Sequence, residues 1–449
     1  MATNPTLLRN PSNPPRSADT GHKSRHVARL SNVPLLGRTV LASRIQQAAS
    51  EKPTKATFPN LLAFFQFWKW LGPYLRDLVH HNADYQEYRA GKTGVFAVTA
   101  PPGGGPMRIA VAADWGTGTL EADTVRQNME ANDPHYTVHL GDVYYMGETG
   151  EVEENCLGEP RNGFTGVSWP RENTQGSFAL MGNHEMYSGG QAYFQGLLKK
   201  LGLYDSARNV KDPQSASFFA LETDHWLILG LDTGYHSGGV PLFTSIPLIN
   251  RISFLNVDAR FDDKMLGWLE KTLSDPARRL KQCLVLTHHQ PFSSFEHSFD
   301  KPAKQLAQLF TKVGIPAGRD FVWLYGHEHR LTVYNRQIIS ETLNVYPRCI
   351  GHGGMPVSLT NLSRPDPRIL FYDPRSHKID EDHPDTMVGY NGHVLLYLDQ
   401  ATLRIEYRDI AKNQLLFSET FTAAASGSLE YKPTLAPGSP LFPGTRPNA

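Results

Sequence analysis

The sequence predicts an α/β protein built around a mainly parallel sheet. Apolar segments at 108–113 and 137–140 flank a helical segment at 119–132, and this strand–helix–strand order favours parallel pairing. Several apolar segments also end directly at Asp, Asn or His. Because ligand sites in open α/β sheets gather at the carboxyl ends of the strands, we expect a polar site along one sheet edge.

Further strands and one more helix complete the predicted core. The helix at 261–273 is amphipathic, with Met265 and Leu269 on its apolar side. Three closely spaced strands near the end of the chain are typical of an antiparallel meander that closes a sheet. The expected strands are 177–181, 217–221, 226–231, 282–287 and 321–325, followed by the meander at 393–399, 403–409 and 414–420.

Four parts are expected along the 449 residues. The first fifty residues carry seven basic side chains and one acidic one, so 1–56 is predicted to be a basic arm that is disordered or draped over the surface. An aromatic-rich helical segment and a Pro/Gly linker follow at 57–106, and the catalytic domain is expected at 107–422. The Pro-, Gly- and Ser-rich tail at 423–449 is predicted to be disordered.

The aromatic segment permits three interpretations. Its apolar run at 61–71 covers roughly 16 Å as a helix, too short for the ~30 Å hydrocarbon core of a bilayer. A helix hairpin packed on the domain explains it, and so does a peripheral membrane helix or a lid formed by 57–82.

Composition excludes several classes of protein. Lys plus Arg equals Asp plus Glu at 44 each, which gives no electrostatic footprint for nucleic acid or anionic lipid. The three cysteines, Cys156, Cys283 and Cys349, contain no Cys-x-x-Cys pair, which argues against a disulfide scaffold or a thiolate zinc site. The N-terminus lacks a secretory signal, so we expect a cytoplasmic protein, with an organellar transit peptide as the alternative.

Five expected strands end at sets of possible metal ligands. Taken singly, each set has a plain explanation, since Asp commonly caps turns or helices and a lone His is often a core residue. The recurrence of the pattern at five strand ends favours a common site. The sets are Asp114-Trp115-Gly116, Gly141-Asp142-Val143-Tyr144-Tyr145, Gly182-Asn183-His184-Glu185, His288-His289, and Gly326-His327-Glu328-His329.

This order of motifs, over about 107–420, resembles the calcineurin-like metallophosphoesterases, and more specifically their purple acid phosphatase branch. The resemblance implies a β-sandwich flanked by helices, with a dinuclear metal site at the carboxyl ends of the strands. Most of the superfamily carries a metal-binding His where this chain has Gly116. The purple branch also lacks that His and supplies a tyrosine from the second motif, which corresponds here to Tyr145.

The resemblance also implies the metal ligands. Asp142 would bridge two ions, with Fe(III) at the tyrosinate site and Fe(II), Zn or Mn at the second. Either His288 or His289 would bind the second ion; the spacing to His297 favours His288, and the spacing to Pro291 favours His289. We assign His288 to the metal. The implied first set is Asp114, Asp142, Tyr145 and His329, and the second is Asp142, Asn183, His288 and His327.

The implied reaction is hydrolysis of phosphate monoesters by a metal-bridging water or hydroxide, on a small ester or a phosphoprotein. His184 and His297 would be the catalytic residues, His184 as the acid or to stabilise the phosphoryl group and His297 to orient the phosphate. Together with His289 they would also contact the substrate. One alternative keeps the metals but acts on a diester, either a cyclic nucleotide or a phospholipid headgroup. Another is a membrane- or partner-recruited protein with a structural metal site.

Overall fold

The computed structural model describes residues 82–103, 105–144, 146–161, 166–237, 258–359, 362, 364–378, 387–424 and 427–445. The predictions for the basic arm at 1–56 and for the aromatic run at 61–71 lie outside the described residues, and so does Tyr145. No helix in the described part of the chain combines the length and the apolar character needed to span a bilayer.

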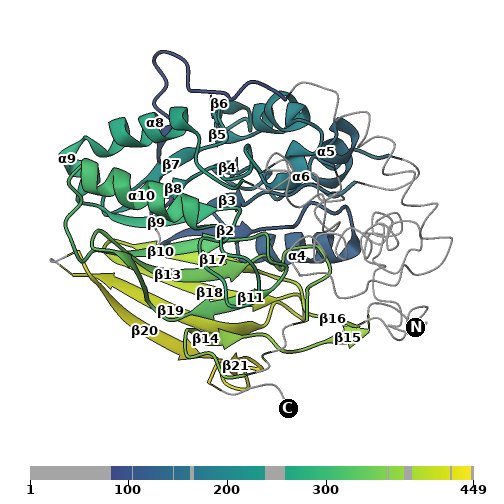
Figure 1. The fold of residues 1–449 in the computed structure, drawn as a ribbon. Helices are drawn as coiled ribbons and strands as arrows, with labels where there is room; N and C mark the ends of the chain where they lie inside the picture. Colours follow the sequence, from purple (N-terminus) through teal and green to yellow (C-terminus); the bar gives the residue numbers. More distant parts are fainter. Residues whose placement is uncertain are drawn as a thin grey trace, which may run out of the picture.

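Two large sheets pack face to face, and helices cover their outer faces (Figure 1). Within the described ranges, one sheet has ten strands, the other nine, and a separate pair of short strands lies beside them. This arrangement confirms the predicted β-sandwich flanked by helices.

The strands of the ten-stranded sheet are, in spatial order, β1 (Val95–Ala97), β7 (Phe219–Glu222), β8 (Trp226–Gly230), β9 (Gln282–Thr287), β10 (Asp320–Tyr325), β13 (Leu343–Ile350), β11 (Leu331–Tyr334), β14 (Ile369–Tyr372) and β21 (Phe442–Pro443), with β12 (Gln337–Ser340) beside β13. Those of the nine-stranded sheet are β20 (Leu429–Leu435), β19 (Leu415–Ala423), β18 (Thr402–Asp409), β17 (Gly392–Asp399), β2 (Met107–Ala112), β3 (Tyr136–His139), β4 (Gly176–Ala179), β5 (Gly202–Tyr204) and β6 (Val210–Pro213). The separate pair is β15 (His377–Lys378) and β16 (Met387–Val388). The helical segments are α4 (Leu120–Glu130), α5 (Thr149–Asn155), α6 (Asn183–Met186), η1 (Tyr193–Leu197), η2 (Leu198–Lys200), α8 (Asp263–Leu273), α9 (Pro276–Arg279) and α10 (Asp300–Lys312).

The parallel part of each sheet sets up the site. Strands β2, β3 and β4 pair in parallel in one sheet, as do β8, β9, β10 and β13 in the other. The polar sets that follow β2, β3, β4, β9 and β10 are therefore delivered to the same edge of the sandwich. The predicted parallel pairing of the first two core strands is confirmed.

The core consists of three apolar layers. The central layer combines residues of both sheets, including Ile109 and Val138 from one and Leu284 and Leu324 from the other. An outer layer lies between the ten-stranded sheet and helices α8 and α10, and another between the nine-stranded sheet and α4 with η1. Met265 is among the residues that α8 buries, as the helical periodicity predicts.

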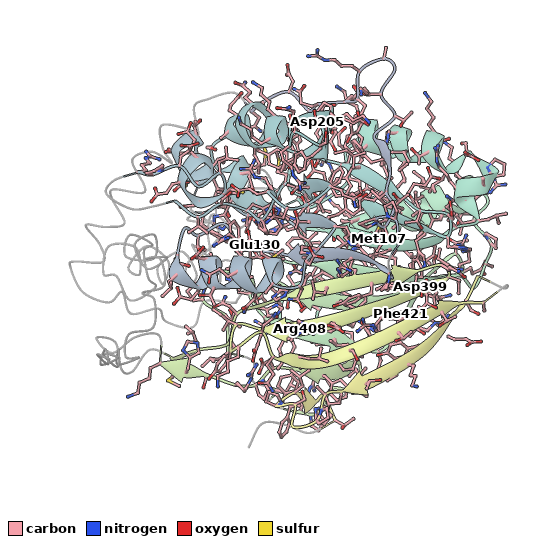
Figure 2. The ribbon with its side chains drawn as sticks, turned by 180° about the vertical axis from the view of Figure 1, so that it is seen from behind. Met107, Glu130, Asp205, Asp399, Arg408 and Phe421 are labelled. Atoms are coloured by element: carbon pink, nitrogen blue, oxygen red, sulfur yellow. The ribbon has the colours of Figure 1, made fainter. Side chains whose placement is uncertain are left out.

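The antiparallel meander is also confirmed. Strands β17, β18 and β19 pair in sequence, and β17 pairs antiparallel with β2. Figure 2 shows this sheet from behind, with Asp399, Arg408 and Phe421 marking the three strands. The meander thus joins the C-terminal part of the chain to the first strand of the core.

Ordered strands extend beyond the expected domain at 107–422 on both sides. The disorder predicted from 423 is wrong for most of this tail, because β20 pairs with β19 and buries Leu429. Pro433 lies in β20, which is an edge strand and therefore tolerates a residue without an N–H group. Upstream, β1 pairs with β7 and buries Phe96, so the body begins before residue 107.

Candidate metal centre

Side chains from the first, second and fifth strand ends meet around one phenol. The Oη atom of Tyr144 lies 2.9 Å from Asp114 Oδ1, 3.0 Å from Asp142 Oδ2 and 3.1 Å from His329 Nε2. All four side chains are buried. Two carboxylates, an imidazole and a phenol therefore offer four donor atoms within one small volume.

A second cluster adjoins the first. The amide oxygen of Asn183 lies 3.1 Å from His288 Nε2 and 3.0 Å from His327 Nδ1. His288 Nε2 is also 3.4 Å from Asp142 Oδ1, so opposite oxygens of one carboxylate face the two clusters. The candidate ligand atoms of Asp114, Asp142 and His288 lie within 4.8 Å of one another.

Backbone strain accompanies three of these residues. Asp114, Asp142 and His327 have φ angles of 56°, 72° and 67°, in the left-handed region that L residues seldom occupy. Such strain costs about 1–3 kcal/mol per residue and concentrates at functional sites. The fold therefore holds these three side chains in place at a cost to stability.

Glycines allow the loops to approach the carboxylates closely. A Cβ atom on Gly326 would stand 2.5 Å from Asp114 Oδ2, and one on Gly182 would collide with Asp142 Oδ1. The space for a side chain is also limited at position 116, where a histidine would be expected in most of the superfamily. A Cβ atom there would lie 3.0 Å from the Cα atom of Val143, a tight contact that a side chain at 116 could adopt only if Val143 shifted slightly.

Glu185, to which the sequence assigned no role, joins two of the ligand loops. Its carboxylate accepts hydrogen bonds from the backbone N–H groups of Gly182, Asp142 and Val143, at 2.9, 3.2 and 3.0 Å. Burial and the nearby Asp142 raise the pKa of Glu185 to about 8. Glu185 is the third residue after the N-cap Gly182 of α6, the position from which a glutamate accepts the N-cap N–H in a capping box, and this spacing is the signal that could have identified it.

The charge balance of the site favours bound cations. Burial lowers the pKa of His288, but the carboxylate of Asp142 outweighs this and raises it to about 9. Burial favours the protonated form of Asp142, yet His288 and His184 hold its pKa well below the usual value. Buried carboxylates need compensating positive charge, which a metal ion supplies. The possible ligands are oxygen atoms of carboxylates, an amide and a phenol, and nitrogen atoms of imidazoles. Metal ions of this kind bind such donors.

The orientation of Asn183 is fixed by a tyrosine that the sequence also missed. Its Nδ2 atom donates to Tyr187 Oη at 2.6 Å, which leaves the amide oxygen directed at the imidazoles. Hydrogen bonds of this kind orient the residues that bind metal.

Among the described residues, the phenol at the first cluster belongs to Tyr144, the residue before the expected Tyr145. The sequence assigned Tyr145, which lies outside the described residues, so that assignment stays a prediction. The phenol that reaches Asp114 and Asp142 is that of Tyr144. Two adjacent tyrosines follow Val143, and motif spacing alone could not show which one faces the carboxylates.

The expected catalytic and substrate-binding histidines lie at different depths. His184 Nε2 is 3.8 Å from Asp142 Oδ2, and its ring packs against that of Tyr144 with 4.4 Å between the centroids. The ring of His289 stands 4.5 Å from that of His327. His297 is exposed, and its ring contacts Phe299 at 5.2 Å. The structure thus brings His184 and His289 to the ligand clusters and leaves His297 at the rim.

Comparison with known proteins identifies the family. The family model described as calcineurin-like phosphoesterase matches residues 107–331, half of the chain. Comparison with curated protein sequences gives no match.

Solved structures give only distant likenesses. A purple acid phosphatase from yellow lupin (Lupinus luteus) seeds is 16% identical with a TM-score of 0.45, and the match covers 72% of this chain and 55% of that one. The chain therefore spans about half the length of the lupin protein. GAP50, named as the anchor in the inner membrane complex of Plasmodium, is 12% identical with a TM-score of 0.44, covering 70% of this chain and 88% of that one. PhoD is 13% identical with a TM-score of 0.43, covering 74% and 72%.

These three structures differ too much in sequence to indicate a function. The family of this chain is identified by the family model that matches residues 107–331. Members of that family use two metal ions, and the described residues contain His/Asp groups that could hold them. The chain belongs to the calcineurin-like phosphoesterase family.

Proposed function

We propose that this protein hydrolyses phosphate monoesters with two metal ions bound at the edge of the sandwich. The position of Asp142 is the observation that supports this most strongly. Its Oδ2 atom faces Tyr144 at 3.0 Å and its Oδ1 atom faces His288 at 3.4 Å, so a single carboxylate lies between two donor clusters. A carboxylate in this position is suited to bridge two cations.

The two clusters differ in the ions that they suit. Asp114, Tyr144 and His329, together with Asp142, offer mainly oxygen donors, which suit a hard ion such as Fe(III). Asn183, His288 and His327, again with Asp142, suit Fe(II), Zn or Mn. When bound, the ions would supply charge neutralisation at the phosphoryl oxygens and acidify water at neutral pH.

His184 is the protein group best placed to handle a proton. Its Nε2 atom is 3.8 Å from Asp142 Oδ2, and its backbone N–H donates to Asp142 Oδ1 at 3.1 Å. Fixed beside the bridging carboxylate, it would donate a proton to the leaving oxygen or stabilise the phosphoryl group. His297, at the rim, would orient the ester.

The substrate class is tested by parallel assays of p-nitrophenyl phosphate and bis(p-nitrophenyl) phosphate. We expect the monoester to have the higher kcat/KM, because its dianionic phosphate gains more from two cations and an imidazole than a monoanionic diester does. A strong preference for the diester would overturn the monoester proposal while leaving the metal pair intact. Absence of hydrolysis of either ester by protein loaded with two ions would overturn the phosphoesterase proposal.

The phenolate ligand is tested by visible absorption of the iron-loaded, oxidised protein. Burial and the carboxylates of Asp114 and Asp142 raise the pKa of Tyr144 well above its usual value, so ionisation of this phenol needs a strong Lewis acid beside it. We expect a tyrosinate-to-Fe(III) band that disappears in Tyr144→Phe and persists in Tyr145→Phe. The reverse result would restore the assignment of Tyr145, and absence of a band in the parent protein would exclude phenolate ligation.

A further inference from the structure

His289 presents a buried nitrogen without a partner. Its side chain is 1% exposed, and its Nδ1 atom lies 3.1 Å from Thr233 Oγ1. Its Nε2 atom has no hydrogen-bond partner among the described residues. A buried polar atom is normally paired, because burial without a partner forfeits the hydrogen bond that it would make to water. The Nε2 atom is therefore available to a ligand that the described part of the chain does not provide.

The ring of His289 faces the second donor cluster. Its centroid is 4.8 Å from that of His288 and 4.5 Å from that of His327. One candidate ligand atom from each of these three histidines lies within 4.8 Å of the other two. Two of the three, His288 and His327, already contact the amide oxygen of Asn183.

Adjacent residues rarely point to one place in a strand, since successive side chains alternate between its two faces. Strand β9 ends at Thr287, however, and the chain turns there. The hydroxyl of Thr287 donates to the carbonyl oxygen of His289 at 3.0 Å, and the backbone N–H of His289 donates to Thr233 Oγ1 at 3.0 Å. These bonds fix the turn so that His288 and His289 both reach the cluster, with ring planes at 84°.

We propose that His289 is a further ligand of the second ion, in addition to Asn183, His288, His327 and Asp142. This inference rests on the proposed metal pair. Thr233 Oγ1 has two lone pairs, so it accepts the backbone N–H of His289 and an N–H at Nδ1 together. That tautomer leaves Nε2 unprotonated and able to bind metal, as a hydrogen bond to the other ring nitrogen does at most histidine–metal sites.

The proposal changes the expected metal preference. A position with three imidazoles favours Zn, Fe(II), Co or Ni over Mn and Mg, because nitrogen donors suit the former ions and oxygen donors the latter. It also removes His289 from the substrate contacts expected from the sequence, since an imidazole that binds the ion through Nε2 and Thr233 through Nδ1 has no nitrogen left for a phosphate.

The test compares metal affinity in the parent protein and in His289→Asn. Asparagine retains a polar atom near the Nδ1 position, for contact with Thr233, and removes Nε2. We expect the dissociation constant for Zn at the second position to rise by about 100-fold or more, and that for Mn to rise less. In His289→Gln, whose amide lies near the Nε2 position, part of the loss should be recovered. His225→Ala is the matched control, because His225 is exposed in the turn between β7 and β8.

Proton NMR of the Co(II)-loaded protein provides a second readout that is independent of turnover. Each bound imidazole contributes one exchangeable, paramagnetically shifted N–H signal, so four such signals are expected from His288, His289, His327 and His329. His289→Asn should show three. Four signals and an unchanged Zn/Mn preference in His289→Asn would overturn the proposal, even if KM for the ester rises. Failure of the parent protein to bind two ions would instead contradict the proposed metal pair.

Discussion

Replacing Asp142 with alanine should abolish binding at both metal positions and lower kcat/KM for p-nitrophenyl phosphate by at least about 10³-fold. Loss of a catalytic metal ion removes several kcal/mol of transition-state stabilisation, and each 1.4 kcal/mol corresponds to about tenfold in rate. The effect extends to both positions because the two oxygens of Asp142 face Tyr144 and His288. Metal content by elemental analysis, measured together with turnover, checks this.

The control for this substitution is Asp205→Ala. Asp205, labelled in Figure 2, directly precedes an exposed turn at 206–209, and its carboxylate accepts a hydrogen bond from the backbone N–H of Asn209. Two ions and unchanged turnover are expected in this variant. If Asp142→Ala instead retained one ion at the parent affinity, Asp142 would belong to a single position and the bridging role would be wrong.

Replacing Arg348 with methionine should lower the free energy of unfolding by about 3–5 kcal/mol, the usual cost of removing one partner of a buried ion pair. Arg348, on β13, donates to both oxygens of Glu419, on β19 of the other sheet, at 2.7 and 2.6 Å. Both side chains are fully buried, and Tyr407 donates a further hydrogen bond to Glu419 at 2.6 Å. The substitution would leave a carboxylate buried between the sheets without its cation.

Urea denaturation of single and double variants measures this effect. The double variant Arg348→Met/Glu419→Leu should recover much of the lost stability, because apolar pairs often replace buried ion pairs at little net cost. Arg368→Met is the comparison, since the Arg368–Asp366 pair has a half-exposed arginine and should contribute at most about 1 kcal/mol. An equal decrease in the free energy of unfolding for Arg348→Met and Arg368→Met would show that the buried Arg348–Glu419 pair contributes no more to stability than the half-exposed pair.

The parts of the fold that the sequence predicts best are those with a regular pattern of apolar residues. The strand–helix–strand unit at the start of the core, the helix α8 and the meander β17–β19 were all predicted from periodicity and confirmed. Strand β13 was not predicted, and Pro347 within it argues against a central strand when local sequence alone is considered. Its pairing with β10 and β11 depends on contacts distant in sequence.

The sequence predicts the site residues that directly follow parallel strands. Asp114, Asp142 and Asn183 meet because parallel strands deliver them to one edge, which the βαβ order already indicates. The sequence assigned Tyr145 rather than Tyr144 to the first ion, and it assigned His289 to the substrate rather than to the second ion, as proposed above. Such choices depend on backbone turns, including left-handed residues and the hydrogen bonds of Thr233, that no periodicity encodes.

Metal titration of the metal-free protein tests the central claim most directly. The number of bound Zn or Fe ions per chain should be followed together with hydrolysis of p-nitrophenyl phosphate. Two ions per chain are predicted, with no turnover in their absence and full turnover only when both positions are filled. Saturation at one ion, or full activity without metal, would contradict a dinuclear phosphoesterase.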